Sequence, residues 1–404
     1  MVVKEGYKKT EVGVIPEDWE VKTLGYIGDV KMCKRIFSYQ TKESGIIPFY
    51  KIGTFGKEAD AYISEELYNT YRNRFSFPKK GDILISASGT LGRTVVYDGK
   101  PAYFQDSNII WIENDQKSIS NKFLYHVLQV VQYESEGSTI QRLYNNIVLN
   151  TTFVLPPLKE QTAIATVLSD TDNLIQALEK KIAKKELIKK GAMQELLEPK
   201  EGWEKVLMPE VCWFQEGPGV RNYQFTNSGV KLLNGTNIEK GKLLLEKTER
   251  YISNEEAFGW YSHFLVDEGD ILIACSGVSI EKFHEKVTFA ESKHLPLCMN
   301  TSTMRFKIKS SEITKDFLFH FLKSNSFKEQ IGGKATGSAQ LNFGPSHVSK
   351  VYISMPSRKE QFTIAQILSD MDTEIESLQE KLSKYKQLKQ GLMQELLTGR
   401  IRLV

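Results

Sequence analysis

The stretch KEQTAIATVLSDTD at residues 159–172 returns as KEQFTIAQILSDMD at residues 359–372. The match continues without a gap to GAMQELL and GLMQELL, which end at residues 197 and 397, and 20 of the 39 aligned positions are identical. Chance does not produce a match of this length at a constant offset of 200. The chain is therefore predicted to be a tandem duplication.

Both copies have apolar residues at alternating spacings of three and four, which is the pattern of a helical heptad repeat. A stripe this narrow needs a partner helix, so we predict two long helices, at 158–198 and 357–397, that form a coiled coil. At 1.5 Å per residue each would be roughly 55–60 Å long. The stripe consists of Ile164, Leu168, Thr171, Ile175, Leu178 and Ile182 in the first copy, and of Ile364, Leu368, Met371, Ile375, Leu378, Leu382 and Tyr385 in the second.

The segments that precede the two helices, 1–157 and 199–356, also share markers in the same order. GDILISASG at 81–89 returns as GDILIACSG at 269–277. Collinear markers predict one fold used twice. The loops after these runs differ, as in TLGRTVVYDG against VSIEKFHEKV, so that one scaffold is predicted to present two different surfaces.

Local patterns predict the elements of the first segment. Ile83–Ser86 is an apolar run after a turn, typical of a buried strand, and Val21–Leu24 is typical of a half-buried strand. Phe123–Val131 has helical spacing, and Lys31–Gln40 indicates an irregular or edge segment. The predicted fold class is α+β, with two homologous mixed α/β globular domains separated by the two long helices.

The order of the repeated parts is circular. The first helix is followed closely by Trp203, whereas the second ends with seven residues left and the equivalent Trp19 lies at the start of the chain. The N- and C-termini are therefore predicted to meet, with the tail 398–404 packed near the N-terminus. The resulting pseudo-twofold body would make the helices antiparallel, with one globular segment at each end.

Composition sets further bounds. With 41% hydrophobic and 25% charged residues among 404, the chain is typical of a globular protein of two or three domains. The net charge of +3 permits a polyanionic partner only if positive groups gather on one face. No signal segment opens the chain, and its most apolar short run, Phe317–Leu322, is too short for a bilayer, so a soluble cytoplasmic protein is expected.

The four cysteines, Cys33, Cys212, Cys275 and Cys298, lack metal-binding spacing and are predicted to be buried thiols in a reducing compartment. The sequence also lacks a phosphate loop, a dinucleotide fingerprint and HExxH. The apolar Leu155-Pro156-Pro157-Leu158 does not offer the polar residue that an amino-methyltransferase needs, and it is interpreted as a helix entry.

Two pairs of titratable residues have plain structural interpretations. His126 and His320 occupy matching helical positions and are expected to share a packing role. Asp82 and Asp270 lie in matching turns, where capping explains them better than acid–base chemistry. We predict neither a catalytic residue nor a metal ligand in this chain.

Binding is the better hypothesis. Two similar domains with different loops, held apart by a rigid spacer, are suited to two DNA half-sites at a fixed separation. Base readout needs Arg, Lys, Asn or Gln on loops, with aromatic residues and glycine for close approach. The candidates are Lys34, Arg35, Tyr39, Gln40, Arg93, Gln141, Arg142 and Asn145 in the first domain, and Arg221, Asn222, Tyr223, Gln224, Lys334, Ser338, Gln340 and Asn342 in the second.

Taken singly, each candidate is also typical of a solvated surface, and it is the groups that point to DNA. Gly137-Ser138 and Gly337-Ser338 occupy equivalent places, each with a glutamine a few residues later. A loop of this kind can approach phosphate closely, although an ordinary surface loop has the same composition.

The whole pattern resembles the specificity (S) subunit of type I restriction–modification systems. The motifs that carry the resemblance are PPLKEQTAIATVLSDTD, MPSRKEQFTIAQILSDMD, the paired GDILI runs, the N-terminal EVGVIPEDWEVKTLG and the C-terminal MQELLTGRIRLV. The resemblance covers essentially the whole chain. It implies two target-recognition domains, 1–157 and 199–356, each reading half of a split DNA site in the major groove.

The resemblance also implies partners. The helices would set the gap between half-sites and dock two modification (methyltransferase) subunits, which would bring S-adenosylmethionine. This chain itself would bind no cofactor and catalyse nothing, and a restriction (translocase–nuclease) subunit could join. The near-neutral charge suggests that the partners supply part of the grip on phosphate.

Three alternatives remain open from sequence. A recognition subunit of a type IIB-like system would share this architecture and differ in its partner. A coiled-coil scaffold with two protein-binding domains would have the same fold and no sequence-dependent contact with DNA. An enzyme with an unrecognised site is the third.

Overall fold

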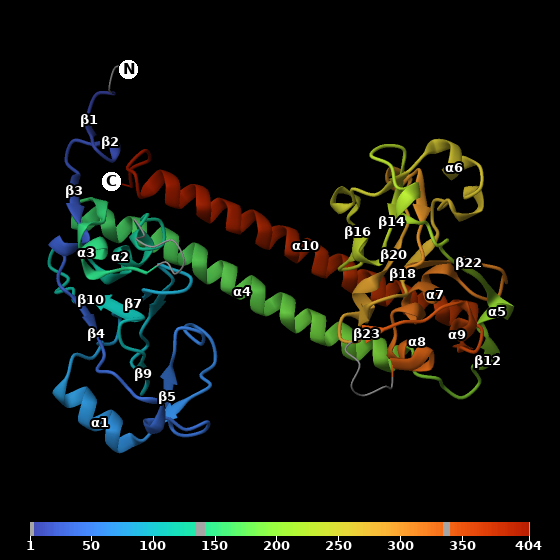
Figure 1. Cartoon of the computed structure of the whole chain (residues 1–404), viewed down its shortest axis with the longest axis horizontal. Helices are drawn as coiled ribbons and strands as arrows, with labels where there is room; N and C mark the ends of the chain where they lie inside the picture. The colour runs from blue at the N-terminus through green and yellow to red at the C-terminus, as the bar shows by residue number, and fades with distance from the viewer. Residues whose placement is uncertain (1–3, 134–141, 334–339, 404) are drawn as a thin grey trace. The chain divides into compact units, whose positions relative to one another are not determined.

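A computed structural model of the chain describes residues 4–133, 142–333 and 340–403 (Figure 1). Its contacts divide the chain into unit 1, residues 1–179 and 380–404, and unit 2, residues 180–379. The predicted long helices are present as α4 (Leu158–Leu196) and α10 (Arg358–Leu396), each of 39 residues. Each unit thus holds one globular segment together with part of both helices.

This division differs from the ranges drawn from sequence. In those ranges each long helix is a separate spacer. In the structure the boundary between the two units falls within both helices, after residue 179 of α4 and after residue 379 of α10. The physical reason is that each half of a helix packs on the nearest globular core: Ile164 and Leu168 are fully buried in the core of unit 1, and Ile364 and Leu368 in that of unit 2.

Unit 1 is built on an antiparallel four-stranded sheet in the order β4-β10-β7-β8. Every residue of β7 is buried because the sheet has a core on each face: Ile83 and Ile85 belong to one core, and Leu84 to the other. The strands are β4 (Val30–Met32), β10 (Ile109–Ile112), β7 (Ile83–Ser86) and β8 (Thr94–Val96).

Smaller elements complete unit 1. A second sheet has the order β6-β5-β9, and β3 pairs with β11 and β1 with β2. The strands are β5 (Ile47–Tyr50), β6 (Tyr62–Ile63), β9 (Tyr103–Phe104), β3 (Glu20–Thr23), β11 (Thr152–Leu155), β1 (Tyr7–Thr10) and β2 (Gly13–Pro16). The short helices are α1 (Glu65–Arg74), α2 (Asn121–Val127) and α3 (Asn145–Asn150).

The local predictions for unit 1 hold with small shifts. The buried strand at Ile83–Ser86 is confirmed, and the half-buried strand begins one residue earlier than predicted, at Glu20. The predicted helix at Phe123–Val131 ends at Val127. Beyond it, the amides of Gln129 and Val130 bond to carbonyls three residues earlier, at 3.2 and 3.0 Å, instead of four.

Unit 2 repeats the topology, with sheets in the orders β13-β22-β18-β20 and β17-β14-β21 and the pair β12-β24. In both units the central strand of the three-stranded sheet has one antiparallel and one parallel neighbour, which confirms one scaffold used twice. The strands are β13 (Cys212–Glu216), β22 (Thr303–Ile308), β18 (Ile271–Ala274), β20 (Val287–Phe289), β17 (Tyr251–Ile252), β14 (Val230–Leu233), β21 (Leu297–Met299), β12 (Glu204–Leu207) and β24 (Tyr352–Met355).

The connections of unit 2 differ from those of unit 1, as the loop sequences predict. Two short pairs, β15-β16 and β19-β23, have no counterpart among the described strands of unit 1. These connecting elements are β15 (Ile238–Glu239), β16 (Lys242–Leu243), β19 (Val278–Ser279), β23 (Gln340–Leu341), α5 (Met208–Val211), α6 (Asn254–Phe258), α7 (Lys315–Leu322), α8 (Asn325–Lys328) and α9 (Pro345–Val348).

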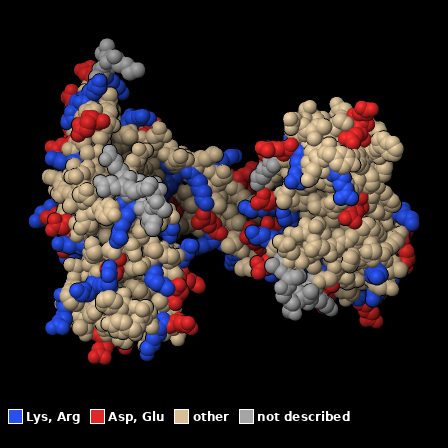
Figure 2. All heavy atoms as spheres, in the orientation of Figure 1, with Lys and Arg blue, Asp and Glu red and all other residues tan. Residues whose placement is uncertain are grey.

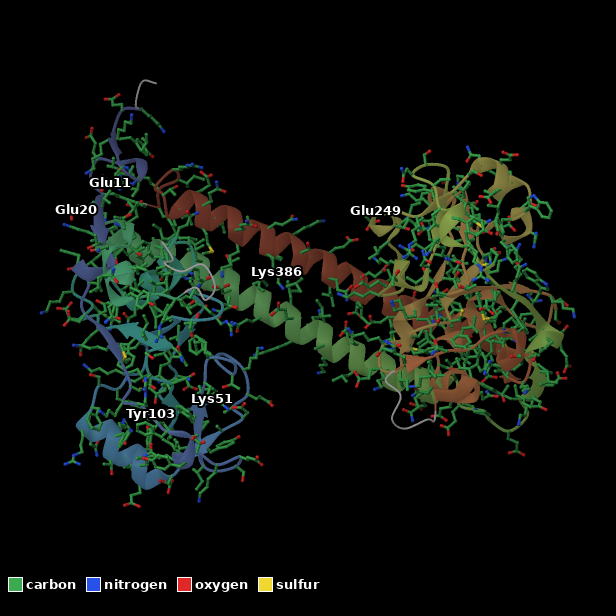
Figure 3. The ribbon with its side chains drawn as sticks, in the orientation of Figure 1. Glu11, Glu20, Lys51, Tyr103, Glu249 and Lys386 are labelled. Carbon is green, nitrogen blue, oxygen red and sulfur yellow. The ribbon has the colours of Figure 1, made fainter. Side chains whose placement is uncertain are left out.

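Ion pairs join the two long helices inside each unit. In unit 1, Lys389 pairs with Asp172 at 2.7 Å and Lys386, labelled in Figure 3, with Glu179 at 2.7 Å. Along this pairing the numbers rise on one helix as they fall on the other, so the segments are antiparallel. In unit 2 the pair Lys189–Asp372 repeats Lys389–Asp172 at the offset of 200.

The glutamine of each KEQ motif fastens the start of a long helix to its globular segment. Gln161 Oε1 accepts the amide of Ser120 at 3.0 Å, and its Nε2 donates to the carbonyls of Ser118 and Pro156, both at 2.9 Å. Ser120 is the N-cap of α2, so the side chain ties two helix starts together.

Gln361 repeats this arrangement in unit 2. It accepts from Thr314, the N-cap of α7, at 2.8 Å and donates to Glu312 at 2.8 Å and Pro356 at 3.0 Å. Both glutamines are buried. The repeated KEQ motif therefore forms the first turn of each long helix and also attaches that helix to its globular segment.

The described ends of the chain are joined in unit 1 by contacts of Tyr7 and Asp18 with the C-terminal tail. Tyr7 donates its hydroxyl to the carbonyl of Gly399 at 3.1 Å. Arg402 donates to both carboxylate oxygens of Asp18 at 2.7 and 2.8 Å, and to Glu160 at 2.7 Å. Glu160 also accepts from Trp19 Nε1 at 2.8 Å.

Candidate nucleic-acid interface

In both units the GDILI strand ends in a Ser-Gly turn. Gly89 and Gly277 follow β7 and β18 with φ of +67° and +66°, a conformation that favours glycine. The residue before each serine donates its amide to a neighbouring loop: Ala87 N to Asn108 O at 2.8 Å, and Cys275 N to Ser302 O at 2.9 Å. The turn and the loop therefore occupy the same position in each scaffold.

A third segment joins each turn from further along the chain. Leu143 N donates to Ala87 O, and Phe343 N to Cys275 O, both at 2.9 Å. The preceding residues, Arg142 and Asn342, therefore take equivalent places beside the Ser-Gly turn. We name this arrangement the polar turn cluster: Ser88, Gly89, 105–108 and Arg142 in unit 1, and Ser276, Gly277, 300–303 and Asn342 in unit 2.

Side chains of different chemistry occupy the two clusters. In unit 1, Arg142 Nη2 donates to the carbonyl of Ser107 at 3.2 Å, and Arg35 Nε pairs with Asp106 at 2.8 Å. In unit 2, Asn342 Oδ1 accepts from Ser276 Oγ at 3.0 Å and from the amide of Gly277 at 2.8 Å. The first cluster presents guanidinium donors, and the second presents a neutral amide.

A short 3₁₀ turn precedes the three-stranded sheet of each unit, at Ser38–Gln40 and Asn222–Gln224. Gln40 Oε1 accepts the amide of Phe37 at 2.9 Å, and Gln224 Oε1 accepts the amide of Arg221 at 3.0 Å. We name these segments the tyrosine turns, because each carries a tyrosine before its glutamine.

Several of the sequence-predicted candidates meet in these two features. Arg35 and Arg142 converge on the loop 105–108, and Asn342 lies in the second polar turn cluster. Arg93 is held elsewhere, by a bond from Nη1 to the carbonyl of Phe55 at 2.8 Å. The tyrosine turns contain Tyr39, Gln40, Asn222, Tyr223 and Gln224, with Arg221 at the N-cap of the second.

The remaining candidates are more dispersed. Lys34 is exposed and lies over the ring of Phe75 at 5.2 Å from its centroid, and Asn145 is the exposed first residue of α3. Gln340 is exposed in β23. Gln141, Lys334 and Ser338 lie outside the described residues, as do the pairs Gly137-Ser138 and Gly337-Ser338.

The two glutamines of the tyrosine turns have structural partners. Gln224 Nε2 donates to Glu256 at 2.8 Å and to the Tyr261 hydroxyl at 3.0 Å, so its amide is engaged on both sides within unit 2.

Sequence reasoning did not select the loop 105–108 or Ser276. No local pattern marks them, because their place in the cluster depends on contacts with distant segments.

On the face of unit 1 that Figure 2 shows, charge does not gather into a single basic patch. On this face, Lys and Arg are interspersed with Asp and Glu. Nonspecific attraction to phosphate is therefore modest on this face, in keeping with a net charge of +3.

The two matched histidines are buried, and each has a hydrogen bond at one ring nitrogen. His126 and His320 bond through Nε2 to Ser169 at 3.3 Å and Ser369 at 3.1 Å, which supports the shared packing role. Burial lowers the pKa of His126 to about 4 and that of His320 to about 3, so both rings are neutral at pH 7.

The paired aspartates cap turns, as predicted. Asp82 accepts the amide of Lys79 at 2.7 Å, and Asp270 that of Asp267 at 3.0 Å. All four cysteines are buried, and burial raises the pKa of each thiol to about 12. Within the described ranges, no three His, Cys, Asp or Glu side chains are grouped so that they could hold a metal ion.

One cavity of about 1680 Å³ lies in unit 2, between the long helices and the globular segment. Its lining carries charges of both signs, including Lys189, Lys323 and Asp372. Burial lowers the pKa of Lys323 to about 8, against the opposing attraction of Asp372. The cavity does not include any residue of the polar turn cluster.

In the described part of the chain, no helix has the length and apolarity needed to cross a membrane.

Comparison with known proteins gives a consistent result. The family profile described as "Type I restriction modification DNA specificity domain" matches twice, at residues 16–188 and 200–387. The type I restriction enzyme MjaVIII specificity subunit of Methanocaldococcus jannaschii is 27% identical over 424 aligned residues, which cover 99% of this chain and 97% of that one.

A Haemophilus influenzae protein whose name describes a type I restriction enzyme specificity subunit is 52% identical over 173 residues. That alignment covers 43% of this chain, and it spans only 45% of the relative. Among solved structures, the S subunit of a type I restriction–modification system from M. genitalium superposes with a TM-score of 0.58 at 15% identity, over 98% of both chains. At this identity the superposition demonstrates a common fold.

Proposed function

The chain belongs to the type I restriction–modification DNA specificity family, and we propose that it is the non-catalytic DNA-reading subunit of such a complex. Each unit would read one half of a bipartite DNA site. The observation that carries this proposal is the polar turn cluster, which occurs once in each unit on the same scaffold. A scaffold repeated with different side chains is suited to two unlike half-sites.

The chemistry of the clusters supports this proposal. Arginine donates to the O6 and N7 atoms of guanine, whereas Asn342, whose Oδ1 is already engaged by Ser276 and Gly277, offers its Nδ2 as a single donor to a base acceptor such as N7 of adenine. Arg142 and Asn342 occupy equivalent places, so the two units would prefer different bases at a corresponding position of their half-sites. The amides and hydroxyls of the neighbouring turns would contact phosphate and fix the register.

Features of the long helices support a role in docking two copies of one methyltransferase subunit. Ile188 and Leu388 occupy equivalent positions on the two helices and are 47% and 50% exposed. Two equal apolar positions offer equal contacts to two identical partners. Those partners would carry S-adenosylmethionine and transfer its methyl group, and restriction subunits could join the assembly.

We expect the chain, purified with its methyltransferase partner, to direct adenine methylation to one bipartite sequence with a fixed gap. Single-molecule sequencing of methylated genomic DNA measures this directly. A complex without this chain is the control and should leave no such pattern. Methylation at a continuous, undivided site would contradict the two-reader proposal, and the absence of any sequence-dependent contact would favour the protein-binding scaffold.

The helices are proposed to set the gap. Insertion of four residues into both helices, after Leu178 and Leu378, should lengthen the preferred gap and leave each half-site unchanged. Insertion into one helix alone breaks the match between the two and serves as the control. The same sequencing measurement applies. Altered half-sites with an unchanged gap would show that the helices do not measure the separation.

A further inference from the structure

The tyrosine turns carry the most exposed aromatic side chains described in their units. Tyr39 is 82% exposed and Tyr223 is 87% exposed, equalled in unit 2 by Trp260. Neither ring contributes appreciably to a core. Among the described rings, Tyr39 stacks on the half-exposed Phe37 alone, with 5.7 Å between ring centroids. A single exposed ring is ordinary, but the recurrence of an exposed tyrosine in the equivalent turn of both units points to a function outside the folded chain.

The backbone beneath each ring is held in one conformation. The glutamine that follows the tyrosine closes the turn with its own side chain, and the amide after it bonds back to the first residue of the turn, as in Thr41 N to Ser38 O at 3.1 Å and Phe225 N to Asn222 O at 3.2 Å. A tyrosine has two rotatable side-chain bonds. Because the backbone is already fixed, little conformational entropy is lost when the ring binds a partner.

Both turns are anchored next to the polar turn cluster of their own unit. In unit 1 the preceding segment is tied to the loop 105–108 by the bond of Arg35 with Asp106. In unit 2 it is tied to the equivalent loop by the bond from Gly217 N to Thr303 O at 3.0 Å. A side chain added at Gly217 would meet the carbonyl of Asn300, so the two segments are in direct contact.

The charges beside the rings favour a polyanion. Lys34 and Arg35 precede the first turn and Arg221 the second, and all three are exposed. Aromatic rings next to cationic side chains are characteristic of nucleic-acid contacts, in which the cation meets phosphate and the ring packs on a base or a thymine methyl group.

We propose that Tyr39 and Tyr223 are the aromatic DNA contacts of the two half-sites, each ring packing on a nucleotide of the half-site that its own unit reads. The proposal rests on the DNA-reading function proposed above and adds to it the side chains that make the contact. The ring supplies the contact, and the hydroxyl group is not required for it.

The test uses the complete complex with its methyltransferase partners. Binding is measured for the Tyr39→Ala, Tyr223→Ala, Tyr39→Phe and Tyr223→Phe variants against three duplexes: the cognate site, and the site with either half-site scrambled. Each alanine variant should bind the cognate duplex about ten- to a hundredfold more weakly, the range typical of one lost aromatic–base contact. Each phenylalanine variant keeps the ring and should stay within about threefold of the original.

The scrambled duplexes assign each ring to a half-site. When the half-site that Tyr39 contacts is scrambled, the Tyr39→Ala variant should lose less affinity than the original protein, because its contact there is already absent. When the other half-site is scrambled, the variant and the original protein should lose the same affinity. Tyr223→Ala should show the reverse pattern. Because both side chains are exposed, the melting temperatures should not change, and the two alanine variants serve as matched controls for each other.

The possible results separate the two proposals. If the original complex prefers its cognate duplex but both alanine variants match it on all three duplexes, the tyrosine contacts are disproved and the DNA-reading function stands. Loss of methyltransferase binding in the alanine variants would also overturn the inference, because the rings would then serve a protein interface. If the original complex does not distinguish the three duplexes, the proposed function itself fails.

Discussion

Replacement of Gln161 or Gln361 with alanine should lower the free energy of unfolding of its unit by about 3–5 kcal/mol. Each side chain bonds to three backbone groups, an amide and two carbonyls, in buried or partly buried surroundings, and alanine would remove all three bonds. The cost of one such unpaired group is about 1–3 kcal/mol. Chemical denaturation measures the effect, with hydrogen exchange at the amides of Ser120 and Thr314 as a local reading.

The controls for this prediction are close at hand. Gln366 lies on the same helix as Gln361, is exposed and bonds only to Asp370 at 2.8 Å, so its alanine variant should change stability by less than about 0.5 kcal/mol. Glutamate at 161 or 361 keeps the acceptor but loses both donors and buries a charge, so it should be no better than alanine. Unchanged stability of both alanine variants would show that water replaces the side chain.

The second large effect is expected at the chain ends. Glu160 is only 2% exposed, and Arg402 donates to it through Nε at 3.0 Å and Nη2 at 2.7 Å. Arg402→Ala would leave a buried carboxylate without its counter-charge, and we expect unit 1 to lose about 3 kcal/mol of stability. Arg400→Ala removes an exposed arginine from the same tail and should cost less than about 1 kcal/mol.

The dependence on pH gives an independent check. Burial alone would raise the pKa of Glu160, but the bonds from Arg402 and Trp19 outweigh it and hold the pKa below the ordinary 4.5. A carboxyl whose pKa is lowered by folding contributes stability above its unfolded pKa and loses it as the pH falls. Without Arg402, burial dominates and raises the pKa of Glu160 above its unfolded value, so protonation of Glu160 favours the folded state and the stability deficit of the Arg402→Ala variant should shrink as the pH falls. An unchanged acid profile would contradict this account.

Much of the fold could be predicted from sequence because it depends on short periods and on repetition. The heptad stripe predicts α4 and α10, and the offset of 200 predicts that both globular segments share one topology. The circular order predicts that the ends of the chain are neighbours, and the bond of Tyr7 with Gly399 joins them. All three predictions follow from patterns that are visible within one repeated half of the sequence or from a comparison of the two halves.

The candidate interface was less predictable. The sequence indicated the right residue types, and the structure brings Arg35 and Arg142 to one loop and Asn342 to its counterpart. The loop 105–108 itself has no local signature. Its place is decided by its contacts with Arg35 and Ser88, which lie 71 and 20 residues away along the chain.

The KEQ motif shows where sequence ends and tertiary structure begins. By itself the sequence determined that 159–197 and 359–397 are matching helices with matching glutamines. It did not determine that Glu160 is buried while Glu360 is half-exposed. The identical glutamates differ because only unit 1 receives the chain's own end, and Arg402, 242 residues away, can neutralise Glu160 only where the fold brings the two together.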